Sequence, residues 1–205
     1  MKILVACEFS GIVREAFRKR GHESWSCDLL PTEIAGNHYQ VDIFDIIYED
    51  WDLIIAHPPC TYLSAAGNRW FNVSRYGDKA RQRIIDRESA VSFFMKIANA
   101  PAEKIAIENP IGTMSTRWRK PNQIVHPYYF GDSERKATCL WLKGLEPLKY
   151  SLNDQVEPVI IEYKNGKGTD SNWHMKTLSL PSELRRHERS RTYLGIANAM
   201  AEQWG

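Results

Sequence analysis

The feature that most constrains this fold is a series of short apolar runs separated by helical patterns. The first run spans residues 2–7, and a helical pattern follows over 12–20, with Gly21 as its end signal. Because strands that alternate with helices pair in parallel and need cover on both faces, the sequence predicts an α/β fold with a mostly parallel sheet. Further strand-like runs lie at 23–27, 40–44, 51–56, 104–108, 123–130 and 137–142, a loop at 61–78, and further helical patterns at 78–99 and 195–203.

Composition limits the class of protein. With 205 residues, 43% of them hydrophobic and 25% charged, the chain suits one globular domain and excludes wholesale disorder. No apolar run is long enough to cross a membrane, and the start resembles a buried strand more than a signal peptide. Cys7, Cys27, Cys60 and Cys139 are widely spread without a CxxC pair, so we expect no metal site and a cytoplasmic location.

Chemically useful side chains gather where the predicted strands end. Glu8 follows the first strand, Asp28 the second, Cys60 the run at 51–56 and Glu108 the run at 104–108. In parallel sheets ligands bind outside the carboxyl ends of the strands. The sequence therefore predicts a ligand site at this edge.

Two of these residues have a reactive setting. Pro58 and Pro59 end a strand and stiffen the turn that carries Cys60, although a loop with a buried cysteine would look the same. Glu108 follows an apolar run, so we expect partial desolvation that favours its neutral, proton-donating form; a strand-end ion pair is the alternative.

Together a cysteine and an acid meet a known chemical need. Position 5 of cytosine is not nucleophilic, but addition of a thiolate at position 6 makes an enamine that is. Protonating or hydrogen-bonding ring nitrogen 3 helps that addition. The chemistry asks for one cysteine and one acid facing a planar base, with an electrophilic methyl donor on the far side.

Four segments, in order and with matching spacing, resemble the cytosine-5 DNA methyltransferase family, and more closely its small phage- and prophage-encoded relatives. The resemblance covers about residues 1–143 and weakly the last helix. It implies the Rossmann-like fold of S-adenosylmethionine-dependent methyltransferases. The segments are Phe9-Ser10-Gly11-Ile12, Pro58-Pro59-Cys60 with the trailing Ser64, Gly67 and Arg69, Glu108-Asn109, and Glu134-Arg135-Lys136.

The resemblance implies a role for each residue near the base. Cys60 would be the nucleophile. Glu108 would engage ring nitrogen 3, with Asn109 helping to position it. Either Arg135 or Lys136 would hold the carbonyl oxygen at position 2.

The resemblance also implies S-adenosylmethionine as the cofactor. Phe9 would pack on its adenine, Ser10 and Gly11 would line its methionine part, and Asp28 would take the ribose hydroxyls. Asp42 would approach the adenine amino group, unless it is only one of five acids in a solvated run. Glu8 and Pro58 are expected to line the same pocket. The family loop usually carries glycines where this chain has Val13 and Arg14.

One departure concerns substrate recognition. Ordinary family members insert a sizeable recognition domain before the last helix, whereas residues 144–187 are short, poor in pattern and marked by a turn signal at Asn165-Gly166-Lys167-Gly168. We therefore expect a single catalytic domain over 1–205, in which 144–187 is a short irregular insertion. Recognition of a long DNA sequence is not expected.

The expected partner is DNA, duplex or single-stranded. The basic stretch from Arg69 to Arg87 contains Trp70, Phe71 and Tyr76, which suits phosphate tracking and base stacking, although a solvated helix face has the same pattern. For duplex DNA the base must be flipped out, and the loop at 61–72 would supply the wedge. One alternative substrate is a free cytosine nucleotide, which the missing recognition domain favours. Two alternative protein classes are an inactive nucleic-acid-binding relative and an amino-methyltransferase. The amino-methyltransferase is the least favoured, because His57-Pro58-Pro59-Cys60 matches the motif of that class poorly. The sequence leaves the oligomeric state open.

Overall fold

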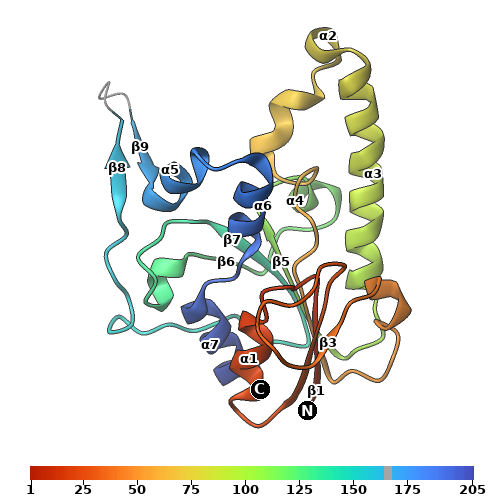
Figure 1. Cartoon of the computed structure of the whole chain (residues 1–205), viewed down its shortest axis with the longest axis vertical. Helices are drawn as coiled ribbons and strands as arrows, with labels where there is room; N and C mark the ends of the chain where they lie inside the picture. Colours follow the sequence, from red (N-terminus) through yellow and green to blue (C-terminus); the bar gives the residue numbers. More distant parts are fainter. Residues whose placement is uncertain (164–167) are drawn as a thin grey trace.

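A computed structural model describes residues 1–163 and 168–205 and has a seven-stranded sheet at its centre (Figure 1). The strand order is β3-β2-β1-β4-β5-β7-β6, and β7 alone runs against the others. This is the mostly parallel, Rossmann-like α/β sheet that the sequence predicts. The strands are β1 (Lys2–Ala6), β2 (Glu23–Cys27), β3 (His38–Tyr39), β4 (Leu53–Ala56), β5 (Lys104–Pro110), β6 (Gln123–Val125) and β7 (Thr138–Lys143).

Successive apolar side chains along each strand point to opposite faces of the sheet, which produces two apolar cores, one on each face. Helices α1 (Ile12–Arg18) and α7 (Leu194–Trp204) cover the face that carries Ile3, Val5 and Leu53. Helix α3 (Asp78–Ala98) and the short 3-10 helix η1 (Ile43–Asp45) cover the other face. Each large aliphatic side chain buried this way contributes about 1.5–3 kcal/mol.

A projecting arm begins after β4. It consists of residues 61–90, which include the 3-10 helix η2 (Ala65–Phe71), the short helix α2 (Val73–Tyr76) and the first half of α3. In α3 the fully buried residues near the sheet are Phe94 and Ile97, whereas the half that belongs to the arm extends beyond the strands (Figure 1). The arm therefore stands above the carboxyl-end edge of the sheet.

The segment 144–187 is more regular than predicted. It contains the hairpin β8 (Ile160–Glu162) and β9 (Thr169–Ser171), helix α5 (Asn172–Leu178) and the start of α6 (Ser182–Ser190). Of the predicted turn, Asn165, Gly166 and Lys167 lie outside the described residues. Two further short elements, α4 (Met114–Arg117) and the 3-10 helix η3 (Pro127–Phe130), complete the order.

Three local predictions are wrong. The strand predicted at 40–44 is replaced by the two-residue β3 and by η1, because the Asp42 carboxylate accepts the backbone N–H of Phe44 and starts a helical turn. The strand predicted at 123–130 stops at Val125, because Pro127 begins η3. The loop predicted at 61–78 contains η2 and α2. Among the described residues, no helix has both the length and the apolar character that a membrane span requires.

Candidate active site

Cys60 and Glu108 lie at the carboxyl ends of two neighbouring parallel strands. Strands β4 and β5 pair in register, with Ala56 opposite Ile107. Glu108 therefore sits at the edge where the chain leaves β4 toward Cys60. This is the edge that the sequence predicts for the site.

The loops that follow β4 and β5 are fastened to each other. The Asn109 amide donates to the carbonyl of Pro58 at 2.8 Å, and the backbone N–H of Thr113 donates to the carbonyl of Leu63 at 2.8 Å. A β-bridge joins Ser64 to Gly112, and a Cβ at Gly112 would lie 2.0 Å from the Leu63 carbonyl oxygen. Only glycine fits there, so the two loops form one unit. Asn109 and Pro58 contribute to this fastening.

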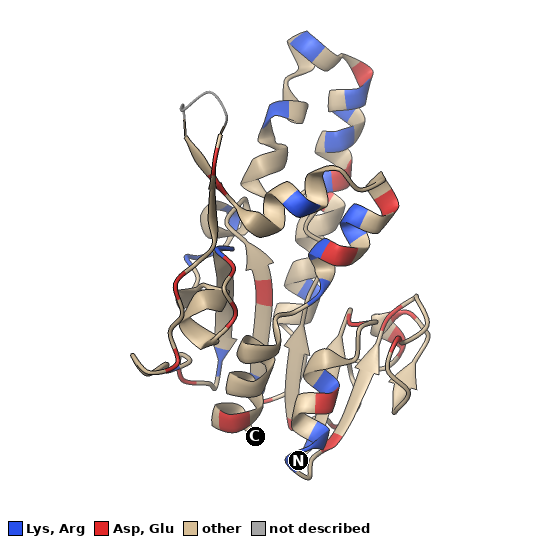
Figure 2. Cartoon of the chain, turned by 60° about the vertical axis from the view of Figure 1, so that its left-hand side comes forward, with Lys and Arg blue, Asp and Glu red and all other residues tan. Residues whose placement is uncertain are grey.

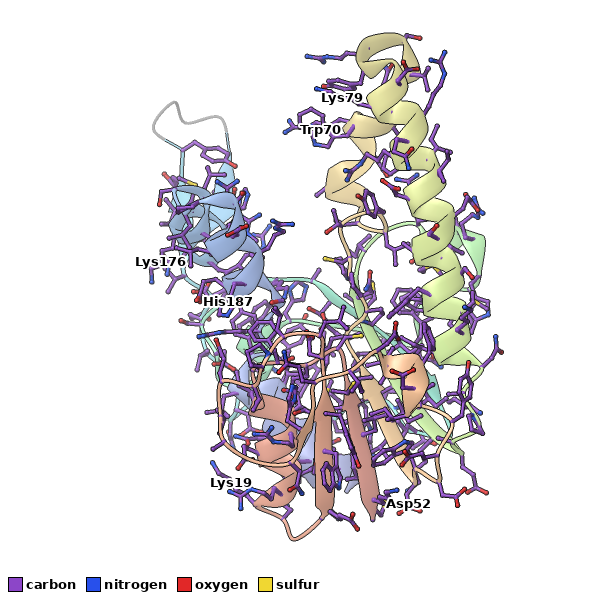
Figure 3. All side chains as sticks on the ribbon, turned by 45° about the vertical axis from the view of Figure 1, so that its right-hand side comes forward. Lys19, Asp52, Trp70, Lys79, Lys176 and His187 are labelled. Atoms are coloured by element: carbon purple, nitrogen blue, oxygen red, sulfur yellow. The ribbon has the colours of Figure 1, made fainter. Side chains whose placement is uncertain are left out.

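Cys60 borders a cleft whose other lining residues all belong to the arm. The cleft has a volume of about 760 Å³, and Trp70, Tyr76 and Lys79 are among the residues that line it. Figure 3 shows Trp70 and Lys79 on the same side of the arm. Although Cys60 is exposed to this cleft, the protein packed around its thiol and the charge of Glu108 raise its pKa, and Lys136 partly offsets them. Among free cysteines, Cys60 is the exposed one.

Glu108 is held by a histidine to which the sequence reasoning gave no role. His57 follows β4 directly, and its Nδ1 lies 2.8 Å from Glu108 Oε2. The two side chains are 6% and 15% exposed. Burial favours protonation of Glu108, but the hydrogen bond with His57 and the charges of Lys136 and His57 outweigh it, so its pKa is lowered.

The prediction that desolvation keeps Glu108 neutral is therefore wrong for this arrangement. Desolvation is present, but the hydrogen bond with His57 and the charge of Lys136 outweigh it. The alternative of a strand-end ion pair describes Glu108 better. The available signal was a histidine directly after one strand, but its pairing with Glu108 depends on β4 and β5 being neighbours, which the sequence did not establish.

Of the two basic candidates, Lys136 faces the site. Its charge acts on both Cys60 and Glu108. Arg135 is exposed. Its charge acts on His126, whose pKa is lowered mainly by burial and further by Arg135. Because successive residues point to opposite sides of an extended chain, one of the pair is turned away.

The segment 144–193 covers Lys136. The Lys136 ammonium lies 5.3 Å from the centroid of the Trp173 ring and 5.7 Å from that of Tyr193, and donates to the carbonyl of Arg189. The Glu134 carboxylate accepts the backbone N–H of Trp173 at 2.9 Å and so fixes the start of α5. The basic motif therefore carries two tasks: Glu134 anchors the insertion, and Lys136 faces the reactive groups.

At the end of β1, the Glu8 side chain caps the N-terminus of helix α1. Its carboxylate accepts the backbone N–H of Val13 at 2.7 Å and of Arg14 at 3.2 Å, and the hydroxyl of Ser10 also donates to it. Burial raises the pKa of Glu8. The preceding residue, Cys7, has a φ of 58°, an uncommon value for a residue other than glycine. The predicted cofactor residues Glu8 and Ser10 are thus occupied with shaping the turn.

Two carboxylates converge beside that turn. Asp28 directly follows β2, and Asp42 directly precedes η1. Burial is the main reason that the pKa of Cys7 is raised, and the charges of Asp28 and Asp42 raise it further. Both carboxylates therefore lie near the end of β1. Carboxylates at this place suit the hydroxyl and amino donors of a nucleoside.

The space around Phe9 and Gly11 is partly filled by the protein. The rings of Phe9 and His187 lie 4.6 Å apart, and Phe9 is 8% exposed. His187 and Arg191 both bind the carboxylate of Glu33, at 2.9 and 2.6 Å, which ties α6 and the residue after it to the loop that follows β2. A Cβ at Gly11 would meet the guanidinium of Arg14 at 2.7 Å. Figure 3 places His187 beside the upper edge of the sheet.

Arg14 stands where the resembling family has a glycine, and it organises the loop at 28–37. Its side chain is fully buried and donates to Ser26 at 2.9 Å and to the carbonyl of Ile34 at 2.5 Å. It also reaches Thr32 and the carbonyl of Asn37. The structure thus gives this departure from the family pattern a role in holding the loop.

Comparisons with known proteins show a distant structural likeness. No protein family matches the chain, and no curated protein does. A solved structure of the Entamoeba histolytica methyltransferase EhMeth aligns with a TM-score of 0.42 and 13% identity, over 89% of this chain and 63% of that one. The chain thus spans less than two thirds of the length of EhMeth. The function proposed below rests on the site itself.

Proposed function

We propose that the protein transfers a methyl group from S-adenosylmethionine to position 5 of cytosine in DNA. The observation that carries this proposal is the meeting of a cleft-facing cysteine, a buried glutamate and a lysine at one sheet edge. Cys60, Glu108 and Lys136 influence one another electrostatically. An amino-methyltransferase would have no use for a cysteine in this place.

Each of the three groups has a task toward a cytosine ring. The sulfur of Cys60 attacks ring carbon 6, Glu108 carries the proton at ring nitrogen 3, and Lys136 holds the carbonyl oxygen at position 2. Asn109 positions Glu108 by fixing its strand end to Pro58. The methyl donor approaches from the side of Phe9 and Asp28.

The cofactor side supports S-adenosylmethionine over a dinucleotide. Dinucleotide enzymes place the pyrophosphate against free backbone N–H groups at the first helix. In α1 the Glu8 carboxylate already takes two of those N–H groups, so a phosphate would meet a negative charge there. Asp28 and Asp42 suit the ribose hydroxyls and the adenine amino group, and S-adenosylmethionine, when bound, supplies the electrophilic methyl group.

The arm supports a polymeric substrate. Between residues 61 and 90 there are six Lys or Arg and three Asp or Glu, a net charge of +3 (Figure 2). Arg83 and Arg87 hold the loop at 61–72 by stacking on Phe71 and donating to the carbonyls of Thr61 and Tyr62. Trp70 and Lys79 remain at the cleft wall, where they suit base stacking and phosphate contact.

Product analysis with three substrates tests the proposal. With S-adenosylmethionine, we expect 5-methyldeoxycytidine from mixed-sequence duplex or single-stranded DNA, detected by mass spectrometry after digestion to nucleosides. Because the reaction passes through an adduct at position 6, the exocyclic amine should carry no methyl group. If only free deoxycytidine nucleotides gave the product, the substrate would be a nucleotide and not DNA. Absence of 5-methylcytosine from every substrate would refute the proposal.

Replacing Lys136 should reduce methyl transfer far more than replacing its neighbour. For Lys136→Gln we expect a loss of about 10²-fold in kcat/KM, because a charged donor to the base carbonyl is removed. Arg135→Gln is the matched control, since Arg135 is exposed and adjacent in sequence. The measurement is the initial rate of 5-methyldeoxycytidine formation for both variants. A larger loss for Arg135→Gln would reverse the assignment.

A further inference from the structure

His57 lies between two buried carboxyl groups. Its backbone N–H donates to the carbonyl of Ala6, at the end of β1, and its ring reaches Glu108 on β5. On the other side its charge acts on Glu8, whose pKa burial raises and His57 lowers. The Nε2 atom of the ring is buried without a hydrogen-bond partner among the described residues.

The contact leaves Glu108 with one occupied oxygen. Oε2 binds the His57 ring, and the structure gives no hydrogen bond to Oε1 among the described residues. The charged or titratable groups that face Glu108 are His57, Lys136, Cys60 and Cys139. Of these, His57 makes the hydrogen bond. The carboxylate is therefore fixed at one end and available at the other.

We propose that His57 is a positioning residue, which holds Glu108 as a carboxylate by one oxygen so that the other can carry a proton between Cys60 and ring nitrogen 3 of cytosine. This inference rests on the function proposed above and specifies how its acid works. In this inference the resting enzyme has an ionised Glu108 beside a protonated Cys60, and not the neutral glutamic acid that the sequence analysis expected.

The proton balance of the addition step closes within the site. The Cys60 thiol gives its proton to the free oxygen of Glu108, and the sulfur forms a bond to ring carbon 6. The π electrons of the bond between carbons 5 and 6 move to form a double bond between carbons 4 and 5, and the π electrons of the bond between carbon 4 and ring nitrogen 3 move onto that nitrogen. Ring nitrogen 3 then takes the proton from Glu108, which returns to the carboxylate bound by His57. After methyl transfer, a solvent base removes the proton from carbon 5, and elimination of Cys60 then reverses the proton movements of the addition step.

The first test needs no substrate. In protein labelled with carbon-13 at the glutamate carboxyls, the Glu108 signal is assigned by its absence in Glu108→Gln, and its titration is followed by NMR. In His57→Phe we expect the midpoint of the Glu108 signal to rise by about one pH unit or more, because burial then acts without its main opponent. An unchanged or lower midpoint would overturn the inference. His22→Asn, at the opposite end of the sheet, is the control.

The second test uses methyl transfer. Asparagine can place an amide donor near the position of Nδ1, whereas phenylalanine cannot, so His57→Asn should recover at least tenfold of the rate lost in His57→Phe. The acidic limb of the pH–rate profile, where protonation of Glu108 stops it from accepting the thiol proton, should also move to higher pH in His57→Phe. Equal rates for both variants with an unmoved limb would mean that His57 only fills space.

The two tests separate failures. If the wild-type protein forms no 5-methylcytosine, the proposed function fails, while the titration of Glu108 still reports on His57. If the wild-type protein is active and the Glu108 midpoint does not depend on His57, the inference alone fails.

Discussion

Cys60→Ser is expected to abolish 5-methylcytosine formation, with a loss on the order of 10³-fold or more in kcat/KM. A serine hydroxyl ionises far less readily than a thiol and adds poorly to ring carbon 6. The environment adds to this effect, because burial and the charge of Glu108 already raise the pKa of the thiol. A hydroxyl in the same surroundings would stay protonated. The measurement is product formation from DNA, quantified by mass spectrometry.

The matched control is another cysteine near the same glutamate. Cys139 lies on β7, buried, and the charge of Glu108 adds to burial in raising its pKa to about 11. Cys139→Ala should keep most of the activity, because its thiol packs in the core and does not face the cleft. A DNA substrate with 5-fluorocytosine should form an adduct stable to denaturation with the wild type and not with Cys60→Ser. Undiminished methyl transfer by Cys60→Ser would exclude covalent catalysis.

Arg14→Met is expected to cost about 3–5 kcal/mol of unfolding free energy, which lowers Tm by roughly 10 °C. The substitution keeps an unbranched stem but removes a guanidinium with five partners. The Ser26 hydroxyl then keeps only its contact with His38, the carbonyl of Ile34 keeps only the hydroxyl of Thr32, and the Glu15 carboxylate loses one partner. Losing several buried hydrogen bonds to one charged group is costly. Thermal and denaturant unfolding, followed by circular dichroism, measure the effect.

The control for Arg14 is Arg18, one turn later on α1. Arg18 binds the same Glu15, but its side chain is 56% exposed. Arg18→Met should therefore unfold near the wild-type midpoint, since exposed ion pairs contribute little. Equal losses of unfolding free energy in both variants would show that contacts within helix α1 determine the stability, and not the hydrogen bonds from Arg14 to the loop at 28–37.

Sequence periodicity was sufficient for the elements of the sheet and its cover. The runs at 2–7, 23–27, 51–56 and 104–108 correspond to β1, β2, β4 and β5, and the helical pattern at 78–99 corresponds to α3. These elements bury regular apolar positions, so their pattern reflects their own structure. The placement of polar residues at strand ends predicted the edge where Cys60 and Glu108 meet.

Elements held by distant contacts were not predictable in the same way. Helix α5 begins where the Glu134 carboxylate, 39 positions earlier, accepts the N–H of Trp173. Helix α6 is polar, and its end is tied by Arg191 to Glu33, 158 positions away. Neither residue spacing nor propensity encodes such partners. The role of His57 was missed for the same reason, because it depends on which strands become neighbours.

The fastening of the loops after β4 and β5 has a consequence for the entropy of the reaction. Asn109, Thr113 and the close approach at Gly112 fix the loop that carries Cys60 to the strand end that carries Glu108 when the chain folds. The ordering of these loops is then part of the folding equilibrium. Under the proposed function, substrate binding would not have to order this part of the protein to align the Cys60 sulfur with the Glu108 carboxylate, so more of the binding free energy would remain to unstack and orient the base.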